Sequence, residues 1–458
     1  MVSSKVHICI IDNGVFQKDF NLYRDMEIVG REIRSVTTES DEWSHGSACA
    51  NVIKKSVTRS YEMSSITILD SSGKGEIDSL LLALEWCKNN AVDIANLSLG
   101  STYFKDKNSL QKMINQCVRS GMTIVAALSN AGYVTYPAGF TNVIAVRKSD
   151  VLNKQEYHIS FTTGLGFGVV ETCGSDTIFV DGQEHETRSS NSIATPYVTS
   201  RIADIYFKNI NPLYIRRFFE KERFDINCFY VDWVENAYID DDIYFFSEMC
   251  NFCVTGSLDN SDTVILIRKD KIEHYLSLGK NILFLENAEL RMSNDCHYIW
   301  SSYNRRRQIE LNTYSGSEDI EIPIVFVQGS KSLNIVWKLC QYMTDKDHNA
   351  YGITDDIIGE LYGLRYVPLR KKDGLAVKKY ICSEIFYGQY DILICDINNY
   401  SKEDIEAEIG IQSDVFVIID GAMAFVYSEV ENRSFSEYGD TLGQYIVELL
   451  TREEKENE

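Results

Sequence analysis

Short apolar runs alternate with amphipathic stretches along the first half of the chain. Five runs have the length of buried strands: Val6–Ile11, Ile66–Leu69, Asp93–Leu97, Thr123–Leu128 and Asn142–Val146. Three stretches between them have the spacing of helices: Ala48–Lys55, Leu80–Asn89 and Leu110–Arg119. This alternation predicts an α/β fold in which helices cover both faces of a parallel sheet.

Polar residues follow three of the predicted strands. Asp12 follows the first strand, Ser98 the third and Asn130 the fourth. Functional groups in parallel sheets collect at the carboxyl ends of the strands. We therefore expect these three side chains at one edge of the sheet.

A polar run directly before a helix contains a candidate nucleophile. Residues 189–196 read SSNSIATP, and a proline at this spacing is typical of a loop or a first helical turn. A serine there suits two roles, an ordinary N-cap and a nucleophile at the positive end of a helix dipole. The stretch alone leaves both open.

Six motifs surround these residues in a fixed order. They read ICIIDNGV, HGSACANVI, ITILDSSGKGEIDSLLLALEWCKNNAVDIANLSLGS, TIVAALSNAG, YPAGFTNVIAV and SNSIATPYV. In that order they resemble the aspartate, histidine, substrate-loop, oxyanion-asparagine, Tyr-Pro-Ala and serine segments of the subtilisin (subtilase) family of serine endopeptidases, which share the chain order Asp, His, Ser. The resemblance covers residues 5–220, nearly half of the chain.

The resemblance implies a role for each polar residue. Ser192 is the expected nucleophile, and Ser189 and Ser190 are expected to be loop residues. His45 is the expected general base and acid, and Asp12 is expected to orient it. Asn130 is expected to donate a hydrogen bond to the oxyanion. Taken singly, each residue suits an ordinary turn or cap, but the shared order and flanking motifs favour the catalytic interpretation.

Two segments match the strands that hold an extended substrate in this family. The substrate-binding residues implied are Lys74, Gly75, Glu76, Ser98, Leu99 and Gly100. Backbone groups of such segments pair with a peptide as an added strand pairs with a sheet. Because Glu76 is acidic, we expect a mild preference for basic residues upstream of the cleaved bond.

Four residues at three places depart from the family pattern. Asn13 replaces a small hydroxyl residue, Ser129 a glycine, and Ser190-Asn191 a Gly-Thr pair. If the turn requires a positive φ, the Cβ of Ser190 strains it. These departures predict a slow or narrow protease. The segment from His45 to Ile66 also lacks the calcium-binding loop of secreted members, so we expect no metal and no cofactor.

Composition and charge limit the partners and the cellular location that we expect for the protein. The chain has 458 residues, 45 basic and 67 acidic, with a net charge of −22, which disfavours nucleic-acid partners. No apolar run has the length of a membrane span or of a signal segment. The 12 cysteines are scattered, with Cys250 and Cys253 the one close pair. This usage is typical of free thiols in a reducing cytoplasm, which we expect as the location.

The second half shows a different pattern. Strand Ile324–Val327, the loop at residues 329–332 and helix Leu333–Met343 faintly resemble a nucleotide P-loop, but two required glycines are missing. The acidic run at 239–242 suits a solvated turn, a calcium site or a site for a basic peptide. An acidic tail over Glu453–Glu458 is expected to be disordered.

The sequence therefore predicts a three-part protein. The parts are a subtilisin-like peptidase domain over residues 1–225, a strand-rich connecting region over 226–320, and a nucleotide-binding-like α/β domain over 321–458. We expect an intracellular serine endopeptidase that matures a specific peptide, as in systems for ribosomally made, modified peptides. The C-terminal domain would then hold the precursor or a partner enzyme. The alternatives are a weakly active or inactive scaffold protein and an enzyme of general protein turnover.

Overall fold

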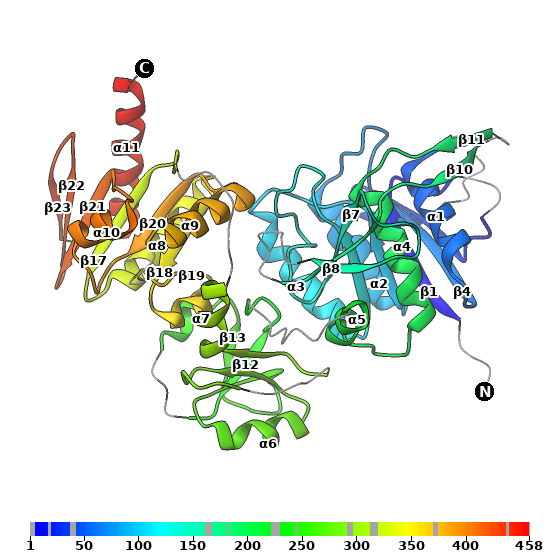
Figure 1. The fold of residues 1–458 in the computed structure, drawn as a ribbon, viewed down its shortest axis with the longest axis horizontal. Coiled ribbons are helices and arrows are strands. Elements are labelled where there is room, and N and C mark those ends of the chain that lie inside the picture. The colour runs from blue at the N-terminus through cyan, green and yellow to red at the C-terminus, as the bar shows by residue number, and fades with distance from the viewer. Residues whose placement is uncertain are drawn as a thin grey trace. The chain divides into compact units, whose positions relative to one another are not determined.

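The computed structural model describes residues 5–457 apart from 17–19, 37–42, 161–166, 181–182, 221–229, 242, 244, 291–295, 312–318, 370–373 and 437–438. The chain divides into two compact units (Figure 1). The first contains Met1–Glu235 and Met292–Tyr298, and the second contains Asn236–Arg291 and Ile299–Glu458. The three-part division at residues 225 and 320 stays a prediction.

A nine-stranded, mostly parallel sheet forms the centre of the first unit. Its order is β3-β2-β4-β1-β5-β6-β7-β9-β8. The strands are β1 (Val6–Asp12), β2 (Arg24–Val29), β3 (Glu32–Ser35), β4 (Tyr61–Thr67), β5 (Ile94–Leu97), β6 (Thr123–Ala127), β7 (Ile144–Ser149), β8 (His158–Ser160) and β9 (Val169–Cys173). A separate hairpin joins β10 (Thr177–Val180) to β11 (Gln183–Glu186).

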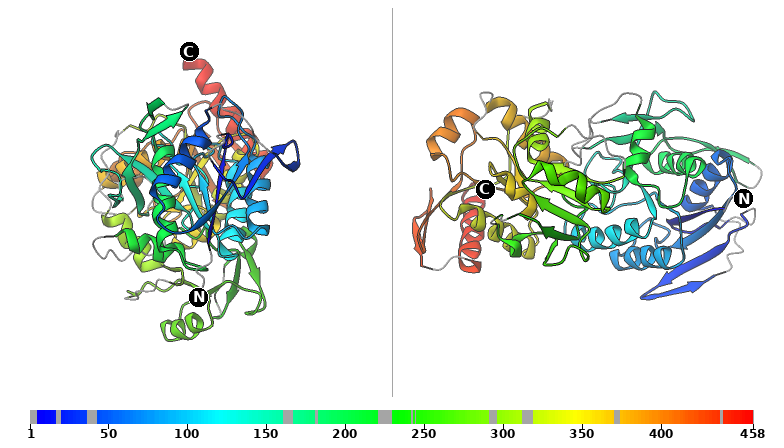
Figure 2. Two further views of the ribbon diagram at one scale, coloured as in Figure 1. Left: turned by 90° about the vertical axis from the view of Figure 1, so that its right-hand side faces the viewer. Right: turned by 90° about the horizontal axis from the view of Figure 1, so that it is seen from below.

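Helices cover both faces of this sheet, as the alternating pattern predicts. Alternate residues of β1 point to opposite faces because side chains along a strand alternate. Ile8 and Ile10 pack in one core with α1 (His45–Ser56), α4 (Asn191–Ile205) and α5 (Pro212–Phe219). Cys9 and Ile11 pack in another with α2 (Ile77–Asn89) and α3 (Asp106–Arg119). Figure 2 shows the unit from two further sides. The predicted α/β class is confirmed.

The second unit contains a five-stranded parallel sheet over the region that the sequence marks only as strand-rich. Its order is β13-β12-β14-β15-β16. The strands are β12 (Asn236–Ile239), β13 (Cys253–Thr255), β14 (Thr263–Leu266), β15 (Asn281–Phe284) and β16 (Ile299–Ser301), with 3-10 turns η1 (Ser247–Met249) and η2 (Lys269–Lys271) and helices α6 (Ile272–Ser277) and α7 (Ser302–Leu311).

Two carboxylates of the acidic run after β12 have partners within the protein. Asp241 accepts hydrogen bonds from the backbone N–H groups of Ile267 and Arg268 at 3.0 and 3.3 Å. Lys271 lies 2.5 Å from Asp240 and 2.9 Å from Asp241. These two carboxylates therefore fix the loop after β14, which favours the turn interpretation; Asp242 lies outside the described residues.

The last part of the chain forms a seven-stranded α/β sheet of order β19-β18-β20-β17-β21-β22-β23, parallel up to β21. The strands are β17 (Ile324–Gly329), β18 (Ala350–Thr354), β19 (Arg365–Tyr366), β20 (Ile392–Asp396), β21 (Val415–Asp420), β22 (Met423–Ser428) and β23 (Arg433–Phe435). The helices are α8 (Ser332–Asp345), η3 (Ile357–Tyr362), α9 (Gly374–Gly388), α10 (Lys402–Ile409) and α11 (Asp440–Asn457).

The loop after β17 is shorter than a phosphate-binding loop. Only Ser330 and Lys331 separate Gly329 from the start of α8. A P-loop needs four residues between its first glycine and its Gly-Lys pair to surround the phosphates.

The predicted α/β class of this region is confirmed.

Two further findings concern the helices. Helix α11 continues to Asn457, so the structure describes the acidic tail as helical up to that residue; its disorder stays a prediction. Within the described residues, no helix combines the length and the apolar character needed to cross a bilayer.

Candidate active site

The structure brings Asp12, His45 and Ser192 together from three separate elements. Asp12 ends β1, His45 begins α1, and Ser192 lies in the first turn of α4. The Nδ1 atom of His45 lies 2.9 Å from Oδ2 of Asp12. Its Nε2 atom lies 3.0 Å from Oγ of Ser192. The three side chains therefore form one continuous hydrogen-bonded chain.

Burial differs among these three hydrogen-bonded side chains in a way that suits proton transfer. The Asp12 side chain is 1% exposed and that of His45 is 32% exposed. Asp12 also accepts a hydrogen bond from the backbone N–H of Asn13 at 2.8 Å. The carboxylate is thus held away from water, while the imidazole keeps an edge open to a substrate.

The turn before the nucleophile is free of backbone strain. Ser190 has φ −156° and ψ 160°, an extended conformation that any residue adopts. It caps α4, since its Oγ accepts a hydrogen bond from the N–H of Ile193 at 3.3 Å. The turn therefore needs no positive φ, and the strain considered for Ser190 does not arise.

Asn130 is held beside the nucleophile by its side-chain oxygen. Oδ1 of Asn130 accepts a hydrogen bond from the backbone N–H of Asn191 at 2.8 Å. Because the oxygen is occupied in this way, the NH₂ group of the amide is the end left to donate to a substrate. This arrangement places a donor next to the residue that precedes Ser192.

Asn191 ties two parts of the site together. Its side chain is buried, and its Nδ2 donates to the carbonyl oxygens of Leu128 and Ser129, both at 2.9 Å. Its Oδ1 accepts from the N–H of Lys148 at 2.9 Å. The departure at residue 191 therefore fixes the segment that carries Asn130 against the start of α4.

Asn13 performs a similar task at the other end of the site. Its Oδ1 accepts a hydrogen bond from the N–H of Gly46 at 3.0 Å. Gly46 follows His45, and its Cα packs so closely that an added Cβ would lie 2.3 Å from the carbonyl oxygen of Gly14. Asn13 thus holds the end of β1 against the start of α1.

Two residues next to the site had no assigned role in the triad predicted from sequence. The buried Sγ of Cys49 lies 4.0 Å from Nδ1 of His45 and 3.3 Å from Oγ of Ser98. Ser98 donates to the carbonyl oxygen of Ser192 at 2.8 Å. The position of Cys49 one helical turn after His45 was a usable signal, because residues four apart share a face of a helix.

Charge near the imidazole raises its pKa. The largest contribution comes from Cys49, burial of the ring opposes it, and the Asp12 carboxylate again raises the pKa of His45. The Cys49 contribution exists only while its sulfur carries a negative charge, whereas the Asp12 contribution is present at every pH at which that carboxylate is ionised. The Asp12 carboxylate, and the Cys49 sulfur where it is ionised, therefore stabilise the cationic imidazole that forms during proton transfer.

Asp12, His45 and Cys49 also have the spacing of a metal-ligand set. Their ligand atoms all lie within 4.8 Å of one another. A thiolate, an imidazole and a carboxylate together suit a soft or borderline divalent ion. A metal held there would occupy the atoms that the proton transfer needs.

The two predicted substrate segments differ in exposure. Lys74, Gly75 and Glu76 are exposed and lead into α2, where Glu76 is the N-cap. Ser98 is buried against Ser192, while Gly100 is exposed. The structure thus places the second segment next to the nucleophile and the first at the start of a helix on the opposite face.

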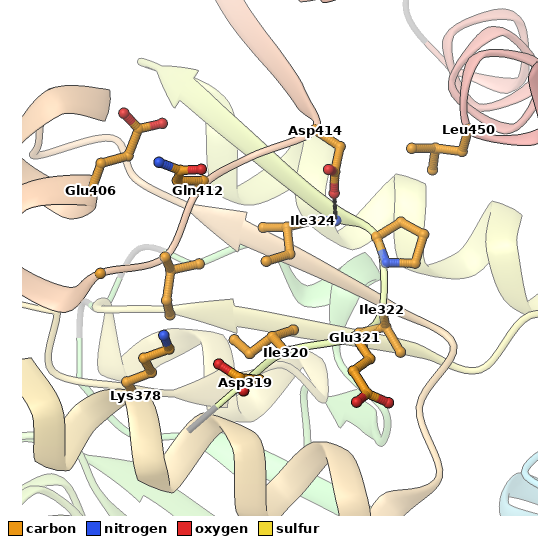
Figure 3. A pocket seen from close by; sticks show the side chains of 13 residues that line it. Asp319, Ile320, Glu321, Ile322, Ile324, Lys378, Glu406, Gln412, Asp414 and Leu450 are labelled. Carbon is orange, nitrogen blue, oxygen red and sulfur yellow. Dashed lines mark hydrogen bonds between the residues drawn. The ribbon is translucent and has the colours of Figure 1, made fainter. Parts of the chain in front are cut away.

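The second unit contains a groove of its own, lined only by residues of that unit. It has a volume of about 970 Å³ and lies where β17 and β21 begin (Figure 3). Its rim includes the side chains of Glu321, Glu406 and Lys378. The carboxylate of Asp414 already accepts a hydrogen bond from the backbone N–H of Ile324 at 2.7 Å. Binding a ligand through this oxygen would therefore cost that hydrogen bond.

Comparison with known proteins finds relatives of the first unit. Residues 3–218 match the model of the subtilase family, described as Peptidase_S8. The chain is 28% identical over 220 residues to Subtilisin Savinase from Lederbergia lenta, covering 46% of this chain and 79% of that protein. An alkaline protease from Shouchella clausii is equally similar, at 28% over 220 residues, with 46% of this chain and 56% of that protein covered.

A further relative is the minor extracellular protease Epr of Bacillus subtilis (strain 168), 28% identical over 219 residues, with 44% of this chain and 32% of that protein covered. The match thus spans about half the length, or less, of several relatives. A solved structure of a cold adapted subtilisin-like serine proteinase matches with a TM-score of 0.36 and 21% identity, over 46% of this chain and 79% of that one. Residues 3–218, slightly under half of the chain, are thus similar to the subtilase family.

Proposed function

We propose that this chain is a serine endopeptidase whose nucleophile is Ser192. The observation that carries the proposal is the hydrogen-bonded chain from Asp12 through His45 to Ser192, with links of 2.9 and 3.0 Å. An imidazole in contact with both a carboxylate and a hydroxyl is the arrangement that activates a serine. The uninterrupted hydrogen bonds of the triad favour a catalytically active protein over a scaffold that only binds.

In the proposed reaction, Oγ of Ser192 attacks the carbonyl carbon of the scissile peptide bond while Nε2 of His45 takes its proton. The amide NH₂ of Asn130 donates a hydrogen bond to the oxyanion that forms. His45 then protonates the leaving amine, the C–N bond breaks, and an acyl-enzyme remains. A water molecule, deprotonated by His45, repeats the sequence and releases the second product.

The proposed setting is the cytoplasm. Every cysteine among the described residues is a free thiol, several of them buried. Free thiols are typical of proteins in a reducing compartment. This observation supports an intracellular enzyme, although relatives such as the Epr protease are extracellular by name.

The proposed substrate is one specific peptide or protein that the enzyme matures. The second unit lies outside the matched residues 3–218 and accounts for about half of the chain. We propose that it holds a precursor peptide or a partner enzyme. General turnover predicts ready digestion of casein, and peptide maturation predicts few cleavage sites.

The test compares the wild-type chain with Ser192→Ala on a peptide library read by mass spectrometry. We expect cleavage of a restricted set of peptides by the wild type and none by Ser192→Ala. Ser189→Ala is the matched control, because Ser189 is an exposed serine three residues away and lies 3.5 Å from Nζ of Lys148. Equal cleavage by wild type and Ser192→Ala would contradict the proposal.

A further inference from the structure

A second serine hydroxyl lies against the proposed nucleophile. Oγ of Ser190 is 2.9 Å from Oγ of Ser192, within hydrogen-bond distance. The sequence alone assigns Ser190 to a loop and treats it as a source of strain. Instead, its extended backbone turns the hydroxyl towards Ser192.

By geometry alone, either hydroxyl could donate this hydrogen bond, and the proposed reaction selects the direction. Each hydroxyl group has one proton to donate and two lone pairs to accept. In the described part of the chain, Ser190 Oγ contacts the N–H of Ile193, which donates to it, and Oγ of Ser192. In the proposed reaction the Ser192 proton is directed to Nε2 of His45 at 3.0 Å, so Ser192 has no second proton and accepts that of Ser190.

A single directed chain results. It runs from the N–H of Ile193 through Ser190 and Ser192 to His45, whose Nδ1 in turn faces Asp12. Hydrogen bonds in such a chain polarise one another in the same direction. With Ser190 as the donor, the Ser192 proton is the one that points to the base.

We propose that Ser190 is a further catalytic residue, which donates a hydrogen bond to the Ser192 oxygen when that oxygen is the leaving group. This inference rests on the proposed peptidase function. During attack, the lone pair of Ser192 Oγ forms the bond to the carbonyl carbon, so the hydrogen bond from Ser190 weakens. During breakdown of the acyl-enzyme, that bond breaks, the electron pair returns to Oγ, and His45 returns the proton.

Negative charge builds on Ser192 Oγ in this last step before the proton arrives. A donor already in place stabilises it, because hydrogen bonds to charged groups are stronger than neutral ones. We therefore expect Ser190 to accelerate deacylation more than acylation, by about tenfold. A residue that only caps α4 would not separate the two steps.

The experiment uses Ser190→Ala, Ser190→Gly and Ser190→Thr in the full chain, with Ser189→Ala as the neighbouring control. Ser190→Ala removes both the hydroxyl and the helix cap, whereas glycine retains most of the capping stability. Threonine restores the hydroxyl. The substrate is a short peptide p-nitrophenyl ester, and the readouts are the burst of p-nitrophenol, the steady-state rate and the melting temperature.

We expect the burst to persist in every variant, with the steady-state rate about tenfold lower in both Ser190→Ala and Ser190→Gly. Threonine should restore the rate, and Ser189→Ala should match the wild type. Equal steady-state rates in the wild type, Ser190→Ala and Ser190→Gly would overturn the role of Ser190. A loss confined to Ser190→Ala, with a lower melting temperature, would reduce Ser190 to a helix cap and also overturn it.

The two levels of the proposal fail separately. No burst and no fluorophosphonate labelling of the folded wild type would overturn the peptidase function, and the role of Ser190 with it. A burst in the wild type with unaltered kinetics in the Ser190 variants would overturn only the role of Ser190.

Discussion

Each unit places a buried aspartate at the carboxyl end of a central parallel strand. Asp12 ends β1 in the first unit, and Asp396 ends β20 in the second. Asp12 faces the imidazole of His45 at 2.9 Å. Asp396 instead accepts two hydroxyl groups, from Ser332 at 2.5 Å and from Thr354 at 2.9 Å. The two aspartates share a position in the fold and differ in their partners.

The difference shows that an aspartate at a strand end acquires chemistry from its neighbours. Burial raises the pKa of the Asp396 carboxyl, while the hydroxyls of Ser332 and Thr354 oppose that rise. No base faces it among its described contacts, so it fastens α8 and β18 to β20. Asp12 faces a group that gains and loses a proton, which is why we assign catalysis to the first unit.

The largest expected effect comes from removing the charge at each aspartate in turn. We expect Asp12→Asn to lower kcat by about 10⁴-fold, because the amide no longer stabilises the cationic imidazole or holds its tautomer. Asp396→Asn should leave kcat unchanged and lower the free energy of unfolding by about 1–3 kcal/mol. Peptide cleavage assays and urea unfolding measure the two. Similar losses of kcat in both variants would contradict the claim that Asp12 is catalytic and Asp396 structural.

Asn130 should show the next largest effect. Asn130→Ala removes the amide donor beside Ser192, and we expect kcat to fall by about 10²–10³-fold with little change in KM. Asn115→Ala is a suitable control, because Asn115 is a buried asparagine of the same unit that bonds to Asn142 and the Asp232 backbone. A rise in KM at constant kcat would instead assign Asn130 to ground-state binding.

Cys49 should shift the pH dependence. His45 must be neutral to accept the Ser192 proton, so the acid limb of kcat/KM follows the pKa of His45. Where the Cys49 sulfur is ionised, it is the largest influence that raises this pKa, ahead of the Asp12 carboxylate. In Cys49→Ala the pKa falls, the imidazole stays neutral to lower pH, and the acid limb moves to lower pH. The measurement is the pH profile of kcat/KM, with Cys117→Ala as a buried control; superimposable profiles of wild type and Cys49→Ala would contradict this.

The smallest effect is expected at Glu76. Glu76→Gln should reduce kcat/KM for peptides with basic residues upstream of the cleaved bond by less than about fivefold, since exposed charge pairs contribute little. Glu85→Gln on the exposed face of the same helix is the control. A library profile without any change in preference for basic residues would remove Glu76 from the substrate site.

The triad was predictable because its residues lie in motifs whose order and flanking sequences are specific. Its contacts were not, since they depend on how distant segments meet. The bonds from Asn191 to Leu128 and Ser129, and from Asn13 to Gly46, join residues 33 or more positions apart. Departures that looked harmful in the sequence thus make the bonds that hold the site.

Buried polar residues limited the prediction of strands. The sequence places a strand at Ile66–Leu69, whereas β4 covers Tyr61–Thr67. Ser64 and Ser65 are fully buried in β4, and Ser64 is paired with Nε2 of His7 at 2.8 Å. A search for apolar runs misses such a strand, because the partner that satisfies the serine lies on another strand.

The most direct test is fluorophosphonate labelling of the folded chain, followed by mass spectrometry of its peptides. The account predicts one added phosphonyl group on Ser192 in the wild type, none in Ser192→Ala, and full labelling of Ser192 in Asp396→Asn. A wild-type chain that folds but remains unlabelled, or that carries the label on another serine, would contradict the assignment of catalysis to the first unit.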